Sequence, residues 1–400
     1  MADLESLFAK RIQGSQSSIV RDLLQYSKMP NIVSLAGGIP AADMFDMEGI
    51  NAALNEVITS GEVNAYQYST TDGETVLQEE IVKLIADRDI KATVDEIVVT
   101  SGSQQGLDLI SRTFLDEGDT ILVERPTYLA AIQGFKMTGA NVEDIEGGVD
   151  GLNVDALEAR LEKGKVKALY IVPTFANPTG STISQEKRKR ILELAVKHNF
   201  VIFEDDPYGE IRFTESLAKP IYSMVTTEEE KEHIVYLSSF SKVLVPGLRL
   251  GFIVTSEKIR SKIVLCKQSV DLHTPVLSQL IVSNYLKSGR LQPRIKEISK
   301  AYEARCQLLI DSLRKHLGDK IRFAQPTGGM FLWATLPKGV SATKLLKHAI
   351  DAEVVFVPGA AFYVGTPEDE TLRLSFATIS EETADEAGRR LAIALANYQD

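Results

Sequence analysis

The chain has 400 residues, 44% of them hydrophobic and 25% charged, which is typical of a soluble globular protein with two domains. The net charge of −11 argues against nucleic acid or an anionic membrane as the main partner, since both require clustered cations. The two cysteines and five histidines show no metal-ligand spacing, and no run resembles a signal peptide or a membrane span, so we expect a cytoplasmic protein without a metal site.

From about residue 50 to 290, short apolar runs of strand length alternate with longer helical patterns. The predicted strands are residues 96–100, 120–124, 168–173, 200–205, 234–239 and 250–254. Helical patterns lie between them, for example at 103–118 and 184–198. Several runs are nearly continuous in Val, Ile, Leu and Phe, as expected for strands covered on both faces. The alternation predicts an α/β fold with a mostly parallel sheet between helices.

The pattern changes after about residue 285. Residues 294–317 form one long amphipathic pattern, which predicts a helix. Three strand-like runs with looser spacing follow, at 328–337, 354–363 and 372–377. We therefore expect a large domain over 46–290 and a smaller α+β domain over 291–400, which the N-terminal segment 1–45 joins.

Polar side chains follow the predicted strands where parallel strands place their carboxyl ends together. Ser103 and Gln104 open a helix after the first strand, directly behind a glycine. Free N–H groups and the helix dipole make such a position a seat for phosphate, although Ser103 alone is more simply an N-cap. Tyr128 follows the second strand, where a packing role is the simpler alternative.

Two further strand ends carry an amide and three acids. Asn177 lies in the turn Asn-Pro-Thr-Gly, and turn chemistry alone could account for it. Asp205 stands between two other acids at the end of an almost wholly apolar strand, where a carboxylate needs a partner. Tyr208 follows three residues later and is expected to project into the same cavity.

The stretch SSFSKVLVPGLRLGF carries the most unusual charges of the chain. Lys242 ends an apolar run beside Ser239 and Ser241, and Arg249 returns after a Pro-Gly turn. A second cation and a desolvated pocket lower the pKa of a lysine, which makes its amine nucleophilic toward an aldehyde.

Taken in order, these residues meet the needs of pyridoxal 5′-phosphate. That cofactor requires a lysine for its aldehyde, donors for its phosphate, an acid for its pyridine nitrogen and donors to its phenolic oxygen. The other common phosphate motifs are missing from the sequence, since it has neither GxxxxGK[ST] nor a convincing GxGxxG.

The chain resembles the class I/II aminotransferases of fold type I, in particular the 2-aminoadipate, kynurenine and aromatic aminotransferase branch. The resemblance covers essentially the whole chain and rests on SLAGGIPAADMF, YQYSTTDGETVLQEEI, TSGSQQGLDL, ERPTY, ANPTG, EDDPY, SSFSKVLVPGLRLGF and LRLSFA. It implies a mostly parallel seven-stranded sheet between helices and a smaller α+β domain. It also implies a ping-pong transfer of an α-amino group, with 2-oxoglutarate as the expected acceptor.

The resemblance implies a role for each matching position. Lys242 would form the Schiff base and shuttle the proton, Asp205 would pair with the pyridinium nitrogen, and Tyr128 would stack on the ring. The phenolic oxygen would receive donors from Asn177 and Tyr208. The phosphate would be held by Ser103, Gln104, Ser239, Ser241 and Arg249, with Tyr68 reaching over from the second subunit of a homodimer.

Substrate roles are implied in the same way. Arg373 would grip the α-carboxylate with both arms of its guanidinium, and Gly38 would let the backbone approach the substrate, although it could merely serve its turn. Asn177 would also contact the substrate. Arg21 matches a position that reads the distal group of the substrate in aminoadipate-type relatives, and a surface helix arginine is the alternative. The donor is expected to be 2-aminoadipate or an aromatic or large hydrophobic amino acid.

Two other functions use the same residues. A β-lyase or decarboxylase would need the same Lys242 and Asp205. An aminotransferase-like regulatory domain is disfavoured, because the segment before Ser34 is too short for a fused DNA-binding module and the basic excess is missing.

Overall fold

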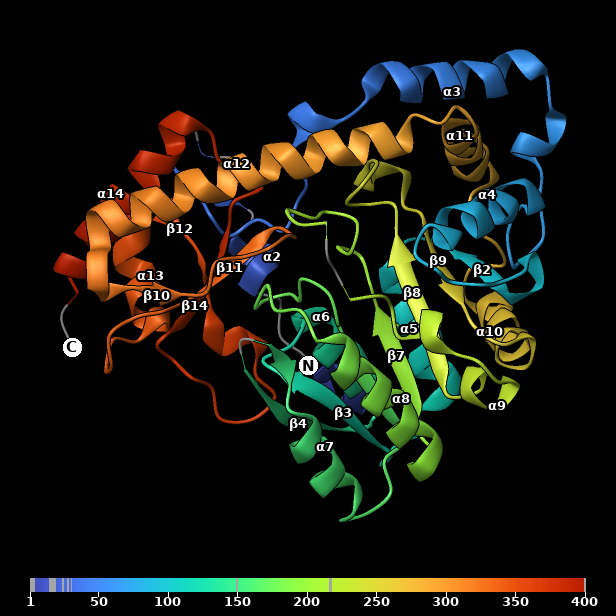
Figure 1. Cartoon of the computed structure of the whole chain (residues 1–400), viewed down its shortest axis with the longest axis horizontal. Helices are drawn as coiled ribbons and strands as arrows, with labels where there is room; N and C mark the ends of the chain where they lie inside the picture. The colour runs from blue at the N-terminus through green and yellow to red at the C-terminus, as the bar shows by residue number, and fades with distance from the viewer. Residues whose placement is uncertain are drawn as a thin grey trace.

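The computed structural model describes residues 4–13, 19–23, 25–26, 29, 31–148, 150–215 and 218–398. Within these ranges the chain forms one large sheet covered by helices and two small sheets, with a long helix running beside both parts (Figure 1). No helix of the described residues is long and apolar enough to cross a membrane.

The large sheet has seven main strands and a two-residue strand at one edge. In spatial order it consists of β2 (Ile97–Thr100), β9 (Gly251–Val254), β8 (Ile234–Ser239), β7 (Val201–Asp205), β6 (Ala168–Ile171), β3 (Thr120–Arg125), β4 (Asn141–Gly148) and β5 (Gly151–Leu152). Strands β3, β4, β6, β7 and β8 pair in parallel, whereas β9 is antiparallel to both of its neighbours. The predicted mostly parallel sheet is therefore confirmed.

Strand β4 is missing from the expected strands. Its sequence, NVEDIEGG, has no apolar run, and most of its residues are partly or fully exposed at the edge of the sheet. It forms because β3 offers a free edge, with which β4 pairs over six residues. The central strand β6 and the edge strand β2 are buried at every position, which explains why their apolar runs predicted them well.

Nine α-helices accompany the large sheet in the described part of the chain. They are α3 (Met47–Ser60), α4 (Thr75–Ala86), α5 (Ser103–Phe114), α6 (Leu129–Met137), α7 (Val154–Leu161), α8 (Gln185–His198), α9 (Glu228–Lys231), α10 (Glu257–Val270) and α11 (Val276–Lys287). Helix α8 shows how the sequence sets the bounds: Ser184 accepts a hydrogen bond from the N–H of Lys187, and Asn199 ends the helix in the left-handed region. Helix α5 ends at Phe114, earlier than its pattern predicted, because Leu115 turns into extended backbone.

The C-terminal part builds on α12 (Leu291–Leu317), which begins three residues before the predicted start. Helix α14 (Glu381–Ala396) packs along it, and α13 (Ala342–Asp351) packs against α14 (Figure 1). A four-stranded sheet has the order β10 (Arg322–Phe323), β11 (Phe331–Thr335), β14 (Thr371–Ser375) and β13 (Val357–Pro358). The predicted strand at 354–363 is split, because β12 (Val354–Val355) leaves this sheet and pairs with β1.

The N-terminal part contributes short elements. They are η1 (Leu4–Leu7), α1 (Lys10–Gln13), α2 (Ile19–Leu23) and β1 (Val33–Ser34). The remaining 3₁₀ turns are η3 (Ala42–Met44), η4 (Val63–Tyr66), η5 (Val94–Glu96), η6 (Tyr222–Met224), η7 (Pro246–Leu248), η8 (Gly318–Lys320) and η9 (Gly359–Phe362).

We propose the division into 1–45, 46–290 and 291–400 as the domain organisation of the chain. The parallel pairing of β1 with β12 supports the assignment of the N-terminal segment to the smaller domain.

Candidate active site

A cavity of about 550 Å³ opens where the parallel strands of the large sheet end. Its walls come from the segments after β2, β3, β6, β7 and β8, and from Phe362 and Arg373 of the C-terminal part. The structure brings nearly all predicted site residues together here: Gly38, Ser103, Gln104, Tyr128, Asn177, Asp205, Tyr208, Ser239, Ser241, Lys242, Arg249 and Arg373.

Asp205 lies at the end of β7 with its carboxylate almost completely buried. Its Oδ2 accepts a hydrogen bond from the hydroxyl of Tyr170 at 2.8 Å, whereas its Oδ1 is buried without a partner. Burial raises the pKa of Asp205 to about 7, against the opposing effect of the Tyr170 hydrogen bond, and the neighbouring Asp206 raises it further. One oxygen of this carboxylate accepts a hydrogen bond and the other does not, so the carboxylate can accept one further hydrogen bond from a cationic N–H group.

Lys242 provides an amine with an unusually low proton affinity. Its Nζ donates to the carbonyl oxygen of Gly38 at 2.7 Å. Burial lowers the pKa of Lys242 to about 8, and the charges of Arg373 and Arg249 lower it further. A larger share of this amine is therefore neutral near pH 7 than for an exposed lysine, as a nucleophile requires.

The anion-binding end of the cavity combines a helix start with an arginine. Helix α5 begins at Ser103 behind Gly102, whose φ of 86° favours glycine. A Cβ atom added to Gly102 would lie 2.6 Å from the guanidinium of Arg249, so only glycine allows this close approach. Ser239 donates to the hydroxyl of Ser241 at 2.9 Å on the same side. Free N–H groups, hydroxyls and a cation thus face one region.

Arg373 lies on β14 and is buried together with its charge. Its two terminal nitrogens donate to Asn177 Oδ1 and to the carbonyl oxygen of Ala36, each at 2.8 Å. Its Nε is buried without a partner, and its guanidinium carbon lies 4.3 Å from the Phe331 ring centroid. Burial lowers the pKa of Arg373 to about 10. This fixed, incompletely satisfied cation can bind a carboxylate.

Tyr128, Tyr208 and Gly38 also line the cavity. The hydroxyl of Tyr128 lies 3.5 Å from Gln104 Oε1, and burial raises the pKa of Tyr128 and of Tyr208. Gly38 has an ordinary backbone conformation, and a Cβ there would make normal contact with Phe331. Its glycine is therefore not required by the turn itself.

Tyr68 is not brought into the cavity, and the position of the Arg21 side chain is not described. Tyr68 is 79% exposed, and its ring lies edge-on to His273 at 5.9 Å. It is outside the residues that line this chain's own cavity. Arg21 belongs to α2, but its side chain lies outside the described part of the structure.

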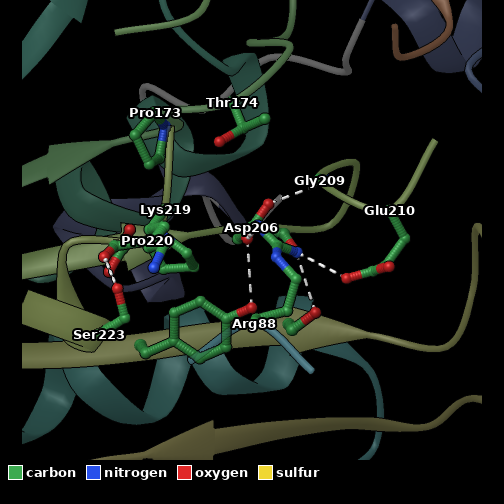
Figure 2. A network of polar contacts seen from close by, with 12 residues as sticks. Arg88, Pro173, Thr174, Asp206, Gly209, Glu210, Lys219, Pro220 and Ser223 are labelled. Atoms are coloured by element: carbon green, nitrogen blue, oxygen red, sulfur yellow. Dashed lines mark hydrogen bonds and ion pairs between the residues drawn. The ribbon is translucent and has the colours of Figure 1, made fainter. Parts of the chain in front are cut away.

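The acids flanking Asp205 find partners that the sequence did not reveal. Asp206 accepts from Arg88 at 2.9 Å, from the N–H of Gly209 at 3.0 Å and from Tyr236 at 3.2 Å, while Arg88 also binds Glu210 (Figure 2). Arg88 lies in the turn directly after α4, so a distant segment fixes the turn that carries Asp205 and Tyr208.

Glu204 is satisfied without a direct ion pair. Its carboxylate accepts from the backbone N–H groups of Ile221 and Tyr222, and burial raises its pKa to about 7. Of the three consecutive acids, only Asp205 keeps a buried oxygen without a partner, and Asp205 lines the cavity.

These features fit pyridoxal phosphate. The unpaired oxygen of Asp205 suits a pyridine N–H, and Lys242 offers an amine of lowered pKa for the aldehyde. Arg249 lies against Gly102 at the start of α5, so its guanidinium and the first N–H groups of the helix suit a phosphate. Arg373 lines the same cavity and keeps a buried Nε without a hydrogen-bond partner.

Comparisons with known proteins agree with this geometry. Residues 16–391 match the family model "Aminotransferase class I and II". The chain is 40% identical to aromatic-amino-acid aminotransferase 1 of Thermococcus litoralis, over 98% of this chain and 94% of the relative. It is 39% identical to the 2-aminoadipate transaminase of Thermus thermophilus, over 97% and 96%. A solved structure of Pyrococcus horikoshii kynurenine aminotransferase, in complex with PMP, superposes with a TM-score of 0.93 at 38% identity, over 99% of this chain and 98% of that one.

Proposed function

The chain belongs to the class I and II aminotransferases and is a pyridoxal phosphate-dependent transaminase, and from that premise we propose that the cavity around Lys242 is its active site. The observation that carries this proposal is the buried, unpaired Oδ1 of Asp205, in the same cavity as the amine of Lys242.

The residues divide the work around the cofactor. When bound, pyridoxal phosphate supplies an electron sink for the bonds at the α-carbon of an amino acid. Lys242 would hold the cofactor through its aldehyde and, with its amine free, would move the proton at the α-carbon. Asp205 would keep the pyridine nitrogen protonated through its unpaired oxygen. Asn177 and Tyr208 would donate to the phenolic oxygen, and Tyr128 would pack against the ring.

The phosphate would be held by residues at the start of α5 and after β8. Ser103 and Gln104 offer the start of α5, and Ser239 and Ser241 offer hydroxyl groups. Arg249 supplies the charge, and its contact with Gly102 places it beside the helix start.

The substrate carboxylate would bind Arg373, which lines the cavity and is oriented by Asn177 and the carbonyl of Ala36. Gly38 lies beside it and lines the same cavity. This arrangement serves donor and acceptor alike, because amino acids and 2-oxo acids share the α-carboxylate.

We propose an aromatic or large hydrophobic amino acid, or 2-aminoadipate, as donor and 2-oxoglutarate as acceptor. The outer wall supports a large side chain, because helix α6 and its surroundings contribute apolar residues: Ile39, Leu129, Ala130, Met137 and Phe362. Among the described lining residues the cations are Lys242, Arg249 and Arg373, all assigned above, so a distal carboxylate needs a further group. Arg21 is our candidate for that group.

Two measurements test the function. A panel of 2-aminoadipate, glutamate, aspartate, kynurenine, Phe, Tyr, Leu and Met, each with 2-oxoglutarate, ranks the donors. With donor alone, the cofactor spectrum should stop at the pyridoxamine form after one turnover. Continued turnover without an oxo acid would instead identify a lyase or decarboxylase.

We further propose a homodimer in which Tyr68 completes the site of the second subunit. Tyr68 is exposed and does not line the cavity of its own chain, which supports this arrangement. Mixing Lys242→Ala with Tyr68→Phe subunits should yield hybrid dimers with one intact site, and hence more activity than either variant alone. Full activity of a monomer would contradict the arrangement.

We also propose a cytoplasmic location. Its support is that Cys266 and Cys306 are both free thiols, which is common in a reducing compartment. Fractionation of cells that produce the protein tests this point.

A further inference from the structure

A buried lysine lies behind the anion-binding end of the cavity. The side chain of Lys267, on α10, is completely shielded from solvent. Its Nζ contacts both carboxylate oxygens of Asp271, at 2.7 and 2.8 Å, and Gln105 Oε1 at 3.3 Å. Neither Lys267 nor Asp271 lines the cavity. Their charges therefore have no direct part in the proposed chemistry.

The burial of Lys267 needs an explanation other than stability, and its partner Asp271 is still 24% exposed. Shielding a charge from water costs about as much as its ion pair returns, and apolar replacements of buried pairs are often neutral. The other buried residues of α10 are Ile259 and Ile263, so an apolar side chain would suit the position.

The pair orients the amide group of Gln105. The Gln105 Nε2 donates to Asp271 Oδ2 at 2.5 Å, while its Oε1 faces the ammonium of Lys267. With the amide held in this direction, the same Oε1 accepts the backbone N–H of Ser101 at 2.8 Å. One cation and one anion thus fix both ends of a single amide.

Further contacts hold the same loop. The hydroxyl of Ser101 lies 3.3 Å from Asp271 Oδ2 and 3.3 Å from Thr274 Oγ1. The next residue is Gly102, in its positive-φ conformation, and α5 starts immediately afterwards at Ser103. The direction of the first N–H groups of α5 therefore depends on where Ser101 is anchored.

We propose that Lys267 and Asp271 are positioning residues that act through Gln105 to hold the loop 101–103 in the conformation that receives the phosphate of the cofactor. This inference rests on the proposed phosphate seat at Ser103 and Arg249. The positioning pair acts on the phosphate end only, because its contacts lead to the loop and not to Asp205 or Lys242.

A comparison of two ligands separates this role from a general structural one. Pyridoxal 5′-phosphate and pyridoxal share the ring and the aldehyde, but only the first carries a phosphate. Loosening of the loop should weaken binding of the phosphorylated form alone. A general loss of structure should weaken both.

The experiment measures dissociation constants of both ligands for the full-length apoenzyme by absorbance titration. The test variant is Lys267→Met, and the control is Lys258→Met, which removes an exposed lysine on the same helix that pairs with Glu232. Gln105→Leu is the second variant, because it removes the amide link without leaving a buried charge. Far-UV circular dichroism and thermal unfolding of each apoenzyme verify the fold.

We expect Lys267→Met and Gln105→Leu to raise the dissociation constant of the phosphorylated ligand on the order of tenfold, with pyridoxal binding changed less than about twofold. Equal weakening of both ligands, or no change in either, would overturn the inference. If Lys267→Met does not fold, the result for Gln105→Leu decides in the same way.

Arg249→Gln distinguishes the two levels of the proposal. If Arg249→Gln weakens binding of the phosphorylated ligand more than binding of pyridoxal, but Lys267→Met and Gln105→Leu do not, the proposed phosphate site stands and the positioning role is wrong. If Arg249→Gln leaves the ratio of the two constants unchanged, the proposed seat itself is wrong.

Discussion

Replacement of Arg373 by lysine tests how the substrate carboxylate is held. The guanidinium is fixed by Asn177 and by the carbonyl of Ala36, and it keeps its buried Nε for a ligand. A lysine keeps the charge but has one nitrogen, so it cannot make these contacts and also receive a carboxylate in two-point geometry. The loss of one to two charge-assisted hydrogen bonds is about 2–3 kcal/mol.

That free energy corresponds to a decrease in kcat/KM of about 30- to 150-fold. The assay follows each half-reaction separately in single turnovers, with donor and with 2-oxo acid. Because both substrates present the same α-carboxylate to Arg373, both half-reactions should slow by similar factors. Arg322→Lys on β10 is the control, since this residue is exposed and remote from the cavity lining. A loss confined to one half-reaction, or below threefold, would refute the assignment.

Three further predictions concern the buried charges. Arg88→Met leaves Asp206 buried without its cation and should lower the free energy of unfolding, measured in urea titrations, by about 3–5 kcal/mol. Adding Asp206→Asn should restore part of this free energy, and no recovery would contradict the ion-pair explanation. Since the pKa of Lys242 is lowered to about 8, cofactor uptake by the apoenzyme should accelerate as the pH rises through that value; a flat profile between about pH 7 and 9 would be inconsistent. Tyr170→Phe removes the hydrogen bond that lowers the pKa of Asp205, so the acid limb of the kcat/KM profile should move to higher pH, and an unmoved limb would count against this contact.

The fold was predictable where burial leaves a strong pattern. Strand β8 was predicted with its observed bounds, and the central strands were found because both faces are covered. Strand β4 was missed because an exposed edge strand needs no apolar run. The split at residues 354–363 was also missed, since the partner of β12 is β1, a strand from the other end of the chain.

The site was predictable as far as the residues stand at strand ends. The cavity also contains Gly38 and Arg373, which only the family resemblance identified. The supporting residues had no such signal. Tyr170 stands inside an apolar strand, Arg88 in a turn after a helix and Lys267 on an ordinary helix. Their partners depend on tertiary contacts that no local spacing encodes.

The central claim is that Lys242 is the amine that binds the cofactor. Reduction of the holoenzyme with borohydride fixes the cofactor to the amine that holds it, and mass spectrometry of a digest locates the modified lysine. The structure predicts a single modification, at Lys242, which disappears in Lys242→Ala together with the absorbance of the bound cofactor. Modification of a different lysine, or an unchanged spectrum in that variant, would contradict the account.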